Sequence, residues 1–247
     1  MKILATYNIK GGVGKTATTV NLAYLAAMEG ARVLVWDLDP QGAATYYFRV
    51  KPKVKGGAKS LLRGKSDVDD LLKATDYENL DLLPADFSYR HMDLHLDDAK
   101  KPMERLKKLL KPLEDDYDYV FLDCPPSISL VSENVFSAAD GLIVPIIPTT
   151  LSLRTLDQLM TFRKKNKLHK TVMLPFFSMS DRRRKLHRDI MDGLPAEIDV
   201  VLKSHIPNCS DVELMGLKRA PLPSYTQKNK RAVKAYKALW KEIKGKV

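Results

Sequence analysis

The sequence predicts an α/β fold in which a doubly wound, mostly parallel sheet is flanked by helices. Apolar strand candidates alternate with helical stretches along the chain, and this alternation is typical of parallel sheets covered on both faces. A glycine-rich loop separates the first strand from the first helix, and two later strands end in aspartate. We therefore expect one domain over residues 1–247, with its functional site at the carboxyl edge of the sheet.

Each expected strand is a short apolar run. The runs are 2–8, 31–37, 80–84, 118–123, 141–147, 170–178 and 199–206. The first helix follows the glycine-rich loop, because Val20, Ala23 and Ala27 recur at helical spacing and Gly30 is placed for a left-handed cap. The segment 51–65 is rich in lysine and glycine, which predicts a surface excursion or a plain solvated loop.

The glycine-rich loop reads KGGVGKT over residues 10–16. It departs from the pattern G-x-x-x-x-G-K-[ST], because Ile9 stands where the first glycine belongs. The glycines allow successive N–H groups to converge on phosphate oxygens. Lys15 supplies a positive charge to the phosphates, and Thr16 offers a hydroxyl to Mg²⁺ at the positive end of the next helix. The expected nucleotide contacts in this loop are Gly11, Gly12, Val13, Gly14, Lys15 and Thr16.

Aspartates follow two of the strand candidates. Asp37 and Asp39 come directly after the run 32–36, and Asp123 ends the run 119–122. The second run is a Walker-B pattern, which places its aspartate beside a bound magnesium ion.

These motifs together resemble the ParA/MinD family of deviant Walker ATPases. The matching pieces are KGGVGKT at 10–16, DLDPQG at 37–42 and LDCPPS at 122–127, with weaker matches at 145–149, at 206–208 and in the final helix. The resemblance covers nearly the whole chain. It implies an ATPase that uses ATP and Mg²⁺, turns over slowly and is stimulated by a partner protein.

The family resemblance also implies a role for each motif residue. In a nucleotide-sandwich homodimer, Lys10 reaches the phosphates of the partner subunit, whereas Lys15 serves its own nucleotide. Asp39 orients the attacking water, so Lys10, Lys15 and Asp39 are the expected catalytic residues. Thr16, Asp37 and Asp123 are the expected metal-shell residues. Catalysis then consists of positioning and charge stabilisation.

Two positions depart from the family pattern. Ala17 stands where a second threonine is usual, so one hydroxyl contact is lost although the backbone N–H remains. Pro207 is followed directly by Asn208, without the usual arginine between them. We assign Ala17, Pro207 and Asn208 to the nucleotide site on the strength of the resemblance.

Composition favours a cytoplasmic enzyme. The 247 residues with 45% apolar content suffice for a substantial core, and no apolar run is long enough to span a bilayer. No signal peptide is expected, because Lys2 is followed almost at once by the strand and the loop. Cys124 and Cys209 are too few for a disulfide framework or a zinc site, and we expect both to be packing residues.

Positive charge is concentrated in the last third of the chain. Residues 1–160 hold 20 Lys and Arg against 22 Asp and Glu, whereas residues 161–247 hold 21 against 8. Such a field attracts duplex phosphates without sequence preference, although solvated helix faces are the plainer alternative. Arg183 follows the M-x-D element of the family and is the first choice for a phosphate contact. The DNA-binding candidates are Arg182, Arg183, Arg184, Lys185, Arg219, Lys230 and Arg231.

The sequence leaves three functions open. The first is a ParA-like enzyme, associated with the nucleoid, that binds DNA non-specifically and positions or segregates a cargo, with hydrolysis driving release. The second is a MinD-like membrane-surface ATPase anchored by the final helix, where Val233, Tyr236 and Trp240 lie in an apolar stripe. We favour core packing for that stripe. The third, a metabolic ligase or metal-cluster assembly ATPase, lacks recognisable thiol ligands.

Overall fold

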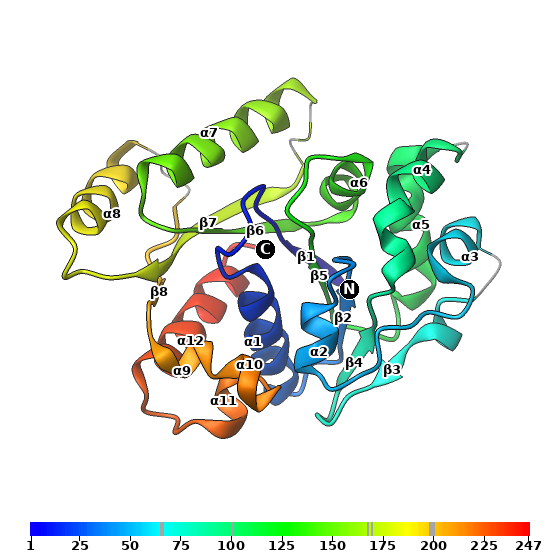
Figure 1. Ribbon diagram of the computed structural model, residues 1–247, viewed down its shortest axis with the longest axis horizontal. Helices are drawn as coiled ribbons and strands as arrows, with labels where there is room; N and C mark the ends of the chain where they lie inside the picture. Colours follow the sequence, from blue (N-terminus) through cyan, green and yellow to red (C-terminus); the bar gives the residue numbers. More distant parts are fainter. Residues whose placement is uncertain (65–66, 100, 167, 169, 198–200) are drawn as a thin grey trace.

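The structure is a computed structural model that describes residues 1–64, 67–99, 101–166, 168, 170–197 and 201–247. One eight-stranded sheet crosses the molecule in the order β3-β4-β2-β5-β1-β6-β7-β8, as Figure 1 shows. Its strands are β1 (Lys2–Thr6), β2 (Val33–Asp37), β3 (Lys73–Ala74), β4 (Leu80–Leu83), β5 (Tyr119–Asp123), β6 (Gly141–Ile146), β7 (Val172–Ser180) and β8 (His205–Pro207). All neighbouring strands are parallel except β3, which pairs with β4 in the antiparallel sense.

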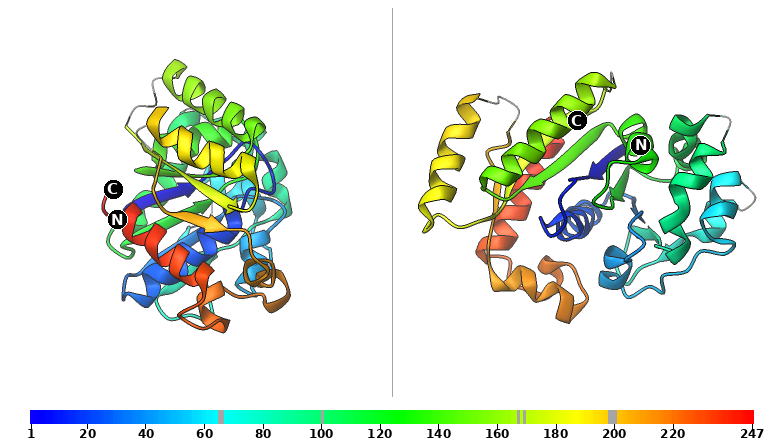
Figure 2. Two further views of the ribbon diagram at one scale, coloured as in Figure 1. Left: turned by 90° about the vertical axis from the view of Figure 1, so that its left-hand side faces the viewer. Right: turned by 45° about the horizontal axis from the view of Figure 1, so that its top comes forward.

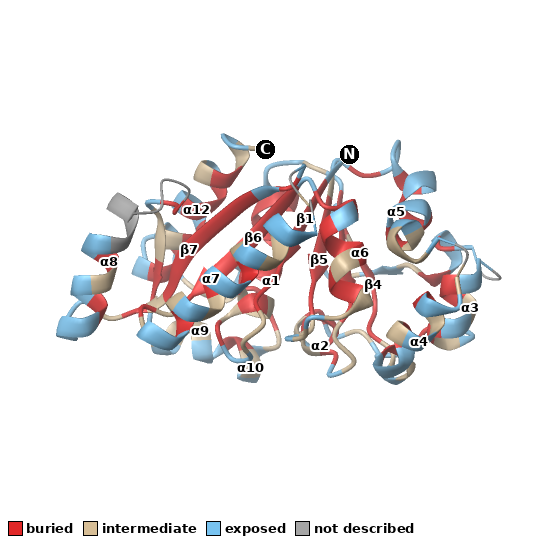
Figure 3. Cartoon of the chain, turned by 90° about the horizontal axis from the view of Figure 1, so that it is seen from above, coloured by how far each residue is buried: buried red, intermediate tan, exposed pale blue. Residues whose placement is uncertain are grey.

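Helices cover both faces of the sheet (Figures 1 and 3). The α-helices are α1 (Lys15–Met28), α2 (Ala43–Tyr47), α3 (Gly57–Arg63), α4 (Met92–Asp97), α5 (Arg105–Leu110), α6 (Leu130–Ala138), α7 (Thr150–Lys165), α8 (Lys185–Glu197), α9 (Ser210–Glu213), α10 (Met215–Lys218), α11 (Leu222–Tyr225) and α12 (Arg231–Lys244). Short 3₁₀ turns occupy Asp69–Leu71, Phe87–His91, Pro102–Glu104 and Lys111–Leu113. The expected doubly wound, mostly parallel fold is confirmed.

Each face of the sheet has its own apolar core. On one face, α1 and α12 pack together against the sheet, and Leu4, Phe121 and Trp240 belong to this cluster. On the other face, α3 to α7 contribute to a second cluster that contains Trp36 and Leu122. The two views in Figure 2 show this layered arrangement from other sides. Neighbouring residues of one strand thus enter different cores because side chains alternate along a strand.

The first helix forms as the sequence predicts. Gly30 follows α1 with φ +91°, a conformation that favours glycine. Fully buried residues such as Val20 and Ala23 pack α1 against the sheet. The helix therefore begins directly at the glycine-rich loop and points its amino end at the carboxyl edge of β1.

The strand predictions hold with shifted ends. Strand β7 begins and ends two residues later than the expected run 170–178, and β3 was not expected. Residues 199 and 200 of the expected run 199–206 lie outside the described residues, and β8 covers only the end of the run and Pro207. The strand β3 could not be predicted because its two residues are exposed and polar or small. They show no alternation of apolar and polar side chains.

The segment 51–65, which follows the Asp37–Asp39 motif, is only partly a surface loop. Residues 51–56 are irregular and, apart from Val54, exposed, as expected. Residues 57–63 instead form α3, and Ala58, Leu61 and Leu62 are buried in the core of that face, so the expectation of a loop is wrong there. Its apolar residues are sparse among lysines and glycines, so their common face emerges only when the segment packs against α4 and α5.

Among the described residues, every helix is too short or too polar to cross a membrane. The apolar stripe of α12 lies inside the protein: Val233, Leu239 and Ile243 have no exposed surface, and Tyr236 and Trp240 have 2% and 1%. The indole N–H of Trp240 donates to Glu29 at 3.0 Å. The preference for core packing of this stripe is therefore confirmed.

Candidate nucleotide site

The glycine-rich loop leaves the carboxyl end of β1, the strand between β5 and β6. Asn8 fixes its start, because the side-chain amide donates to the carbonyl of Pro145 at 2.8 Å and its oxygen accepts the N–H of Lys10 at 2.9 Å. Tyr7 ties the loop to the segment after β5 by donating its hydroxyl to the carbonyl of Ser127 at 2.7 Å. The loop is thus held on two sides by neighbouring strands.

Gly14 is required at the turn into α1. Its φ is +92°, and a Cβ at this position would lie 2.9 Å from Oγ of Ser178. A side chain there is disfavoured both by the backbone conformation and by the approach of β7. No side chain caps the amino end of α1. The first N–H groups of the helix are therefore free of a side-chain acceptor and suited to phosphate oxygens.

The ammonium group of Lys15 is folded back onto its own loop. Its Nζ donates to the carbonyl of Lys10 at 3.1 Å, and the residue is buried. Burial lowers the pKa of Lys15, while the nearby Asp123 and Asp39 act in the opposite direction. A buried cation beside free amides forms a site for a polyanion.

Two fully buried carboxylates lie at the strand ends beside this cation. Asp37 ends β2 and Asp123 ends β5, and the two residues are paired in the register of these strands. Burial raises the pKa of both carboxyls, and repulsion from Asp37 raises the pKa of Asp123 further. Two ionised carboxylates in one dry site are unfavourable unless a cation compensates them or one of them takes up a proton.

The surroundings of the two carboxylates differ. Oδ2 of Asp37 accepts both the N–H and the hydroxyl of Thr45, at 2.8 and 2.7 Å. Oδ1 of Asp123 accepts the hydroxyl of Thr19 at 3.1 Å, whereas its Oδ2 is buried with no hydrogen-bond partner. This open oxygen fits Mg²⁺ or a water in its shell, because Mg²⁺ prefers carboxylate and hydroxyl oxygens. The hydroxyl of Thr16 is suited to help hold the same ion, since Thr16 lies near enough to lower the pKa of Asp123.

Asp39 lies two residues beyond Asp37 and is partly exposed. Its carboxylate accepts the N–H of Gln41 at 2.9 Å, and its carbonyl accepts the N–H of Gly42 at 2.9 Å. These bonds hold a turn that leads into α2. One oxygen of the carboxylate is left available for a water molecule at the edge of the site.

The side chain of Lys10 has no hydrogen bond or ion pair to any residue that the structure describes, and the residue is partly exposed. It stands at the outer side of the loop, while Lys15 occupies the inner side. Ala17 lies in the first turn of α1, where its carbonyl accepts the amide of Asn21 at 2.7 Å.

The late loop is attached to the same edge of the sheet. Pro207 ends β8, and the N–H of Asn208 donates to the carbonyl of Ser180 at the end of β7. Asn208 is exposed and Pro207 is buried. The two residues thus lie three strands away from β1, which leads into the glycine-rich loop, with β6 and β7 in between.

The basic candidates fall into two groups. Arg182 to Arg184 form the turn between β7 and α8, Lys185 begins α8, and Lys230 and Arg231 lie at the start of α12. Burial lowers the pKa of His205, and the charges of Arg182 and Arg231 lower it further. Arg219 lies apart, stacked on the ring of Tyr46 at 4.4 Å. Arg183 is 91% exposed, and its guanidinium forms two 2.9 Å bonds to Asp181.

Sequence reasoning missed several residues that support the site. Thr19 and Thr45 fix the two carboxylates, Asn8 fixes the loop, and Ser178 leaves no room for a side chain at Gly14. The threonines follow their motifs within one or two helical turns, so a hydroxyl near each motif was the available signal. The approach of Ser178 in β7 to Gly14 at the start of α1 carries no sequence signal, since the two residues are far apart in the chain.

The chain is similar to known proteins over most of its length. Residues 1–174 match the family AAA_31, described as an AAA domain. The sporulation initiation inhibitor protein Soj of Bacillus subtilis is 34% identical over 98% of both chains. The chromosome partitioning protein ParA of Caulobacter vibrioides is 32% identical over 84% of this chain and 80% of its own.

Solved structures share the fold. A putative plasmid partition protein from Borrelia burgdorferi bound to AMPPNP superposes with a TM-score of 0.86 at 24% identity, over 100% of this chain and 99% of its own. A cobyrinic acid a,c-diamide synthase from Mycobacterium smegmatis with bound ADP and magnesium superposes with a TM-score of 0.76 at 29% identity. The match covers 89% of this chain and 91% of the synthase chain.

Proposed function

The chain belongs to the ParA/MinD family of P-loop ATPases and is a ParA-like partitioning ATPase that works with ATP and Mg²⁺; we propose that ATP makes it dimerise and bind DNA without sequence preference. In this proposal residues 1–247 act as one ATPase domain. ATP hydrolysis returns the dimer to monomers and releases the DNA. A cargo attached through an adaptor protein, which also stimulates hydrolysis, is thereby positioned or segregated.

The nucleotide is held by the loop and the amino end of α1. The free N–H groups of residues 11–17 bind phosphate oxygens, and Lys15 exchanges its bond to the carbonyl of Lys10 for the phosphates. Lys15 is not an ordinary surface lysine, because it is buried, and a buried ammonium group needs anionic partners. Pro207 and Asn208 are proposed as contacts on the base side.

The magnesium ion is held by Thr16 and Asp123, with Asp37 completing the shell. When bound, it neutralises charge on the phosphates and orients them. The open Oδ2 of Asp123 is the observation that favours this assignment. Asp37 is already saturated by Thr45 and Asp39, so it acts through water in the metal shell.

Dimerisation completes the catalytic site. Asp39 accepts a hydrogen bond from the attacking water and orients it, while Lys10 of each protomer reaches the phosphates held by the other. The proposal is supported by the unpaired position of Lys10 on the outer side of the loop. A positive charge supplied across the interface stabilises the charge that develops on the transferred phosphoryl group.

The proposed DNA surface is built around His205 by the turn 181–185 and the start of α12. Arg184 and Lys185 are exposed, and Arg182 and Arg231 come from segments far apart in the sequence. Convergence of cations from two elements favours a phosphate-binding surface over separate solvated helix faces. Arg219 is proposed as a further DNA contact. Its guanidinium stacks on the ring of Tyr46 in α2, next to the turn that contains Asp39.

The structure disfavours the membrane-anchor alternative, because the apolar stripe of α12 is buried in the core. Burial of Trp240 against Tyr119 and Phe121, with ring centroids 5.2 and 5.8 Å apart, leaves no apolar face on this helix for a bilayer. We accordingly propose a cytoplasmic protein associated with the nucleoid.

Co-sedimentation tests the proposal. The protein is incubated with DNA-coated beads of arbitrary sequence, with anionic liposomes or with bare beads, in the presence of Mg²⁺ and either ATP or ADP. We expect ATP-dependent pelleting with DNA only, which weakens steeply as salt rises. Arg182→Ala/Arg231→Ala should lose this pelleting, while Lys59→Ala/Arg90→Ala, which removes the same charge elsewhere, should retain it. Equal pelleting with ATP and ADP, or pelleting with liposomes instead, would contradict the proposal.

A further inference from the structure

A second cavity lies at the amino edge of the sheet, opposite the nucleotide site. Its volume is about 510 Å³, and it is bordered by α5, the end of α6 and the residues just before β7. The lining residues are Glu104, Lys107, Lys108, Lys111, Phe136, Ser137, Leu168, Lys170 and Thr171. None of them belongs to the ATPase motifs, so the cavity is separate from the established activity.

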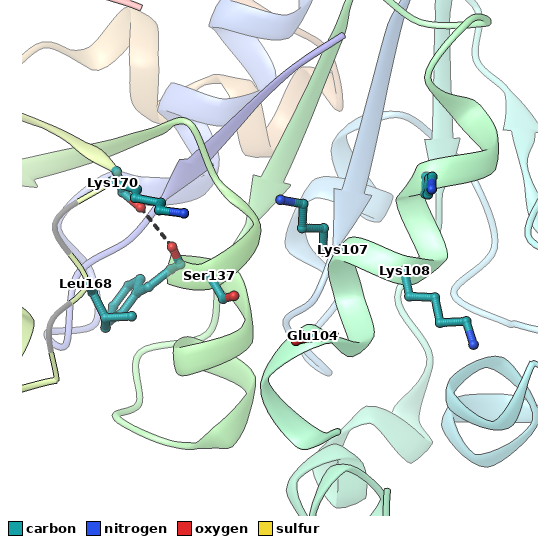
Figure 4. A pocket seen from close by; sticks show the side chains of 9 residues that line it. Glu104, Lys107, Lys108, Ser137, Leu168 and Lys170 are labelled. Atoms are coloured by element: carbon teal, nitrogen blue, oxygen red, sulfur yellow. Dashed lines mark hydrogen bonds between the residues drawn. The ribbon is translucent and has the colours of Figure 1, made fainter. Parts of the chain in front are cut away.

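The charge around this cavity is strongly positive. Four lysines and one glutamate line it, and the carboxylate of Glu104 is already bonded to Lys101 at 3.3 Å. None of the four lysines forms an ion pair with a carboxylate that the structure describes. In Figure 4, Lys107 and Lys170 extend toward one another from opposite walls, whereas Lys108 points away. Two unpaired ammonium groups that converge on one space repel each other unless an anion lies between them.

The walls of the cavity are fixed in place by the surrounding structure. Phe136 is buried and packs edge-on against Tyr7 and Phe162, with ring centroids 4.8 and 6.0 Å apart. Thr171 donates its hydroxyl to the carbonyl of Phe136 at 2.8 Å. Arg163 holds the facing segment by donating to the carbonyls of Leu168 and Thr171 at 2.9 and 2.8 Å. The walls are in place before a ligand binds, so binding loses little conformational entropy.

From this geometry we infer that the cavity binds a compact polyphosphate anion, either inorganic or the phosphate chain of a nucleotide. The volume lies within the range of roughly 300–1,000 Å³ that is usual for small-ligand sites. A concave site with lysines on facing walls suits a small anion better than the convex surface of a duplex. Phe136 and Leu168 supply the limited apolar surface that a nucleoside would contact.

Calorimetry with inorganic tripolyphosphate tests this inference. The Lys15→Ala background removes phosphate binding at the glycine-rich loop, so any remaining binding reports another site. We expect one saturable, salt-sensitive site. Lys107→Ala/Lys170→Ala should weaken it by at least about tenfold, because two of the four charges are lost. Lys237→Ala/Lys241→Ala, which removes two exposed charges from α12, should leave the affinity unchanged. A parallel titration with ADP distinguishes a nucleotide from a free polyphosphate by the tighter ligand.

A second measurement avoids any folding defect of the variants. In the nucleotide-free wild-type protein, tripolyphosphate should protect Lys107 and Lys170 from acetylation, as read by mass spectrometry, and leave Lys237 reactive. Absence of saturable binding, equal weakening by the α12 control, or uniform protection of all lysines would overturn the inference. So would duplex DNA that protects the two lysines while tripolyphosphate does not.

Discussion

Asp37 and Asp123 are direct register partners at the carboxyl ends of β2 and β5, and neither side chain is exposed to solvent. Parallel pairing forces the two carboxylates to the same edge of the sheet. Only Asp37 has its oxygens fully engaged, while Oδ2 of Asp123 is left open. This asymmetry is the basis for the proposal that Asp123 contacts the metal while Asp37 supports the shell.

The first prediction concerns stability without ligand. Because burial raises the pKa of Asp123 above its ordinary value of 3.8, the stability linked to this group is complete below that value and is lost as the pH rises through the folded-state pKa. Asp123→Asn removes the charge. It should therefore raise the free energy of unfolding of the ligand-free protein at pH 8 by on the order of 1–3 kcal/mol, with a smaller gain at pH 5. Denaturant unfolding at the two pH values measures the difference.

The same variant should lose its stabilisation by ATP and Mg²⁺. Thermal melting with and without the nucleotide complex checks this, since a ligand stabilises only the state that binds it. The exposed Asp157 provides a control, because Asp157→Asn should change neither the pH dependence nor the ligand response. A destabilised Asp123→Asn protein at pH 8 would show that the carboxylate is stabilising and would refute the prediction.

The second prediction concerns the buried lysine. Lys15→Ala should reduce ATP affinity by on the order of a hundredfold or more, since it removes the cation nearest the phosphates. Calorimetry with a non-hydrolysable ATP analogue measures the loss. Lys10→Ala is the matched control, because it removes the other lysine of the loop and should leave the affinity of the monomer nearly unchanged. Retained affinity in Lys15→Ala would contradict the assignment of the loop.

The third prediction tests whether Lys10 acts across the dimer. Lys10→Ala and Asp39→Ala should each bind ATP and lower turnover by about 10²–10⁴-fold, the usual cost of losing a positioned catalytic group. When the two variants are mixed, one site of each mixed dimer contains an intact Asp39 and receives Lys10 from the other protomer. ATPase activity should therefore recover to a sizeable fraction of the wild-type rate.

The mixing experiment has the opposite outcome if Lys10 acts within its own protomer. If each protomer uses its own Lys10, both sites of the mixed dimer stay defective and no activity returns. Mixing each variant with Lys15→Ala serves as a control for nucleotide occupancy, because that protomer supplies Lys10 and Asp39 but holds no ATP.

The fourth prediction uses the ion pair between Arg183 and Asp181. DNA must compete with this carboxylate for the guanidinium, so Asp181→Asn should tighten DNA binding and Arg183→Ala should weaken it, each by a few-fold. Fluorescence anisotropy against salt measures both affinities, and the salt slope should fall by about one in Arg183→Ala. ATP affinity should be unchanged in both variants; a parallel loss of ATP and DNA binding would point to misfolding.

Much of the site could be predicted because its signals are local in the chain. The loop 10–16 and the aspartates at 37, 39 and 123 sit next to apolar runs, so strand, turn and helix can be placed from neighbouring residues alone. Where the signal is sparse, prediction failed. Helix α3 was missed because its few apolar residues are separated by lysines and glycines and find a common partner only through packing.

The sequence by itself determined that a phosphate-binding loop, a helix and two acidic strand ends exist, because each depends on contiguous residues whose backbone preferences act locally. Tertiary structure alone decided that Thr45 engages Oδ2 of Asp37 while Oδ2 of Asp123 stays open, that α12 covers the sheet, that Arg182 and Arg231 both lower the pKa of His205 and that Lys107 faces Lys170. These relationships join residues far apart in the chain, and only the packing of both sheet faces sets the distances between them.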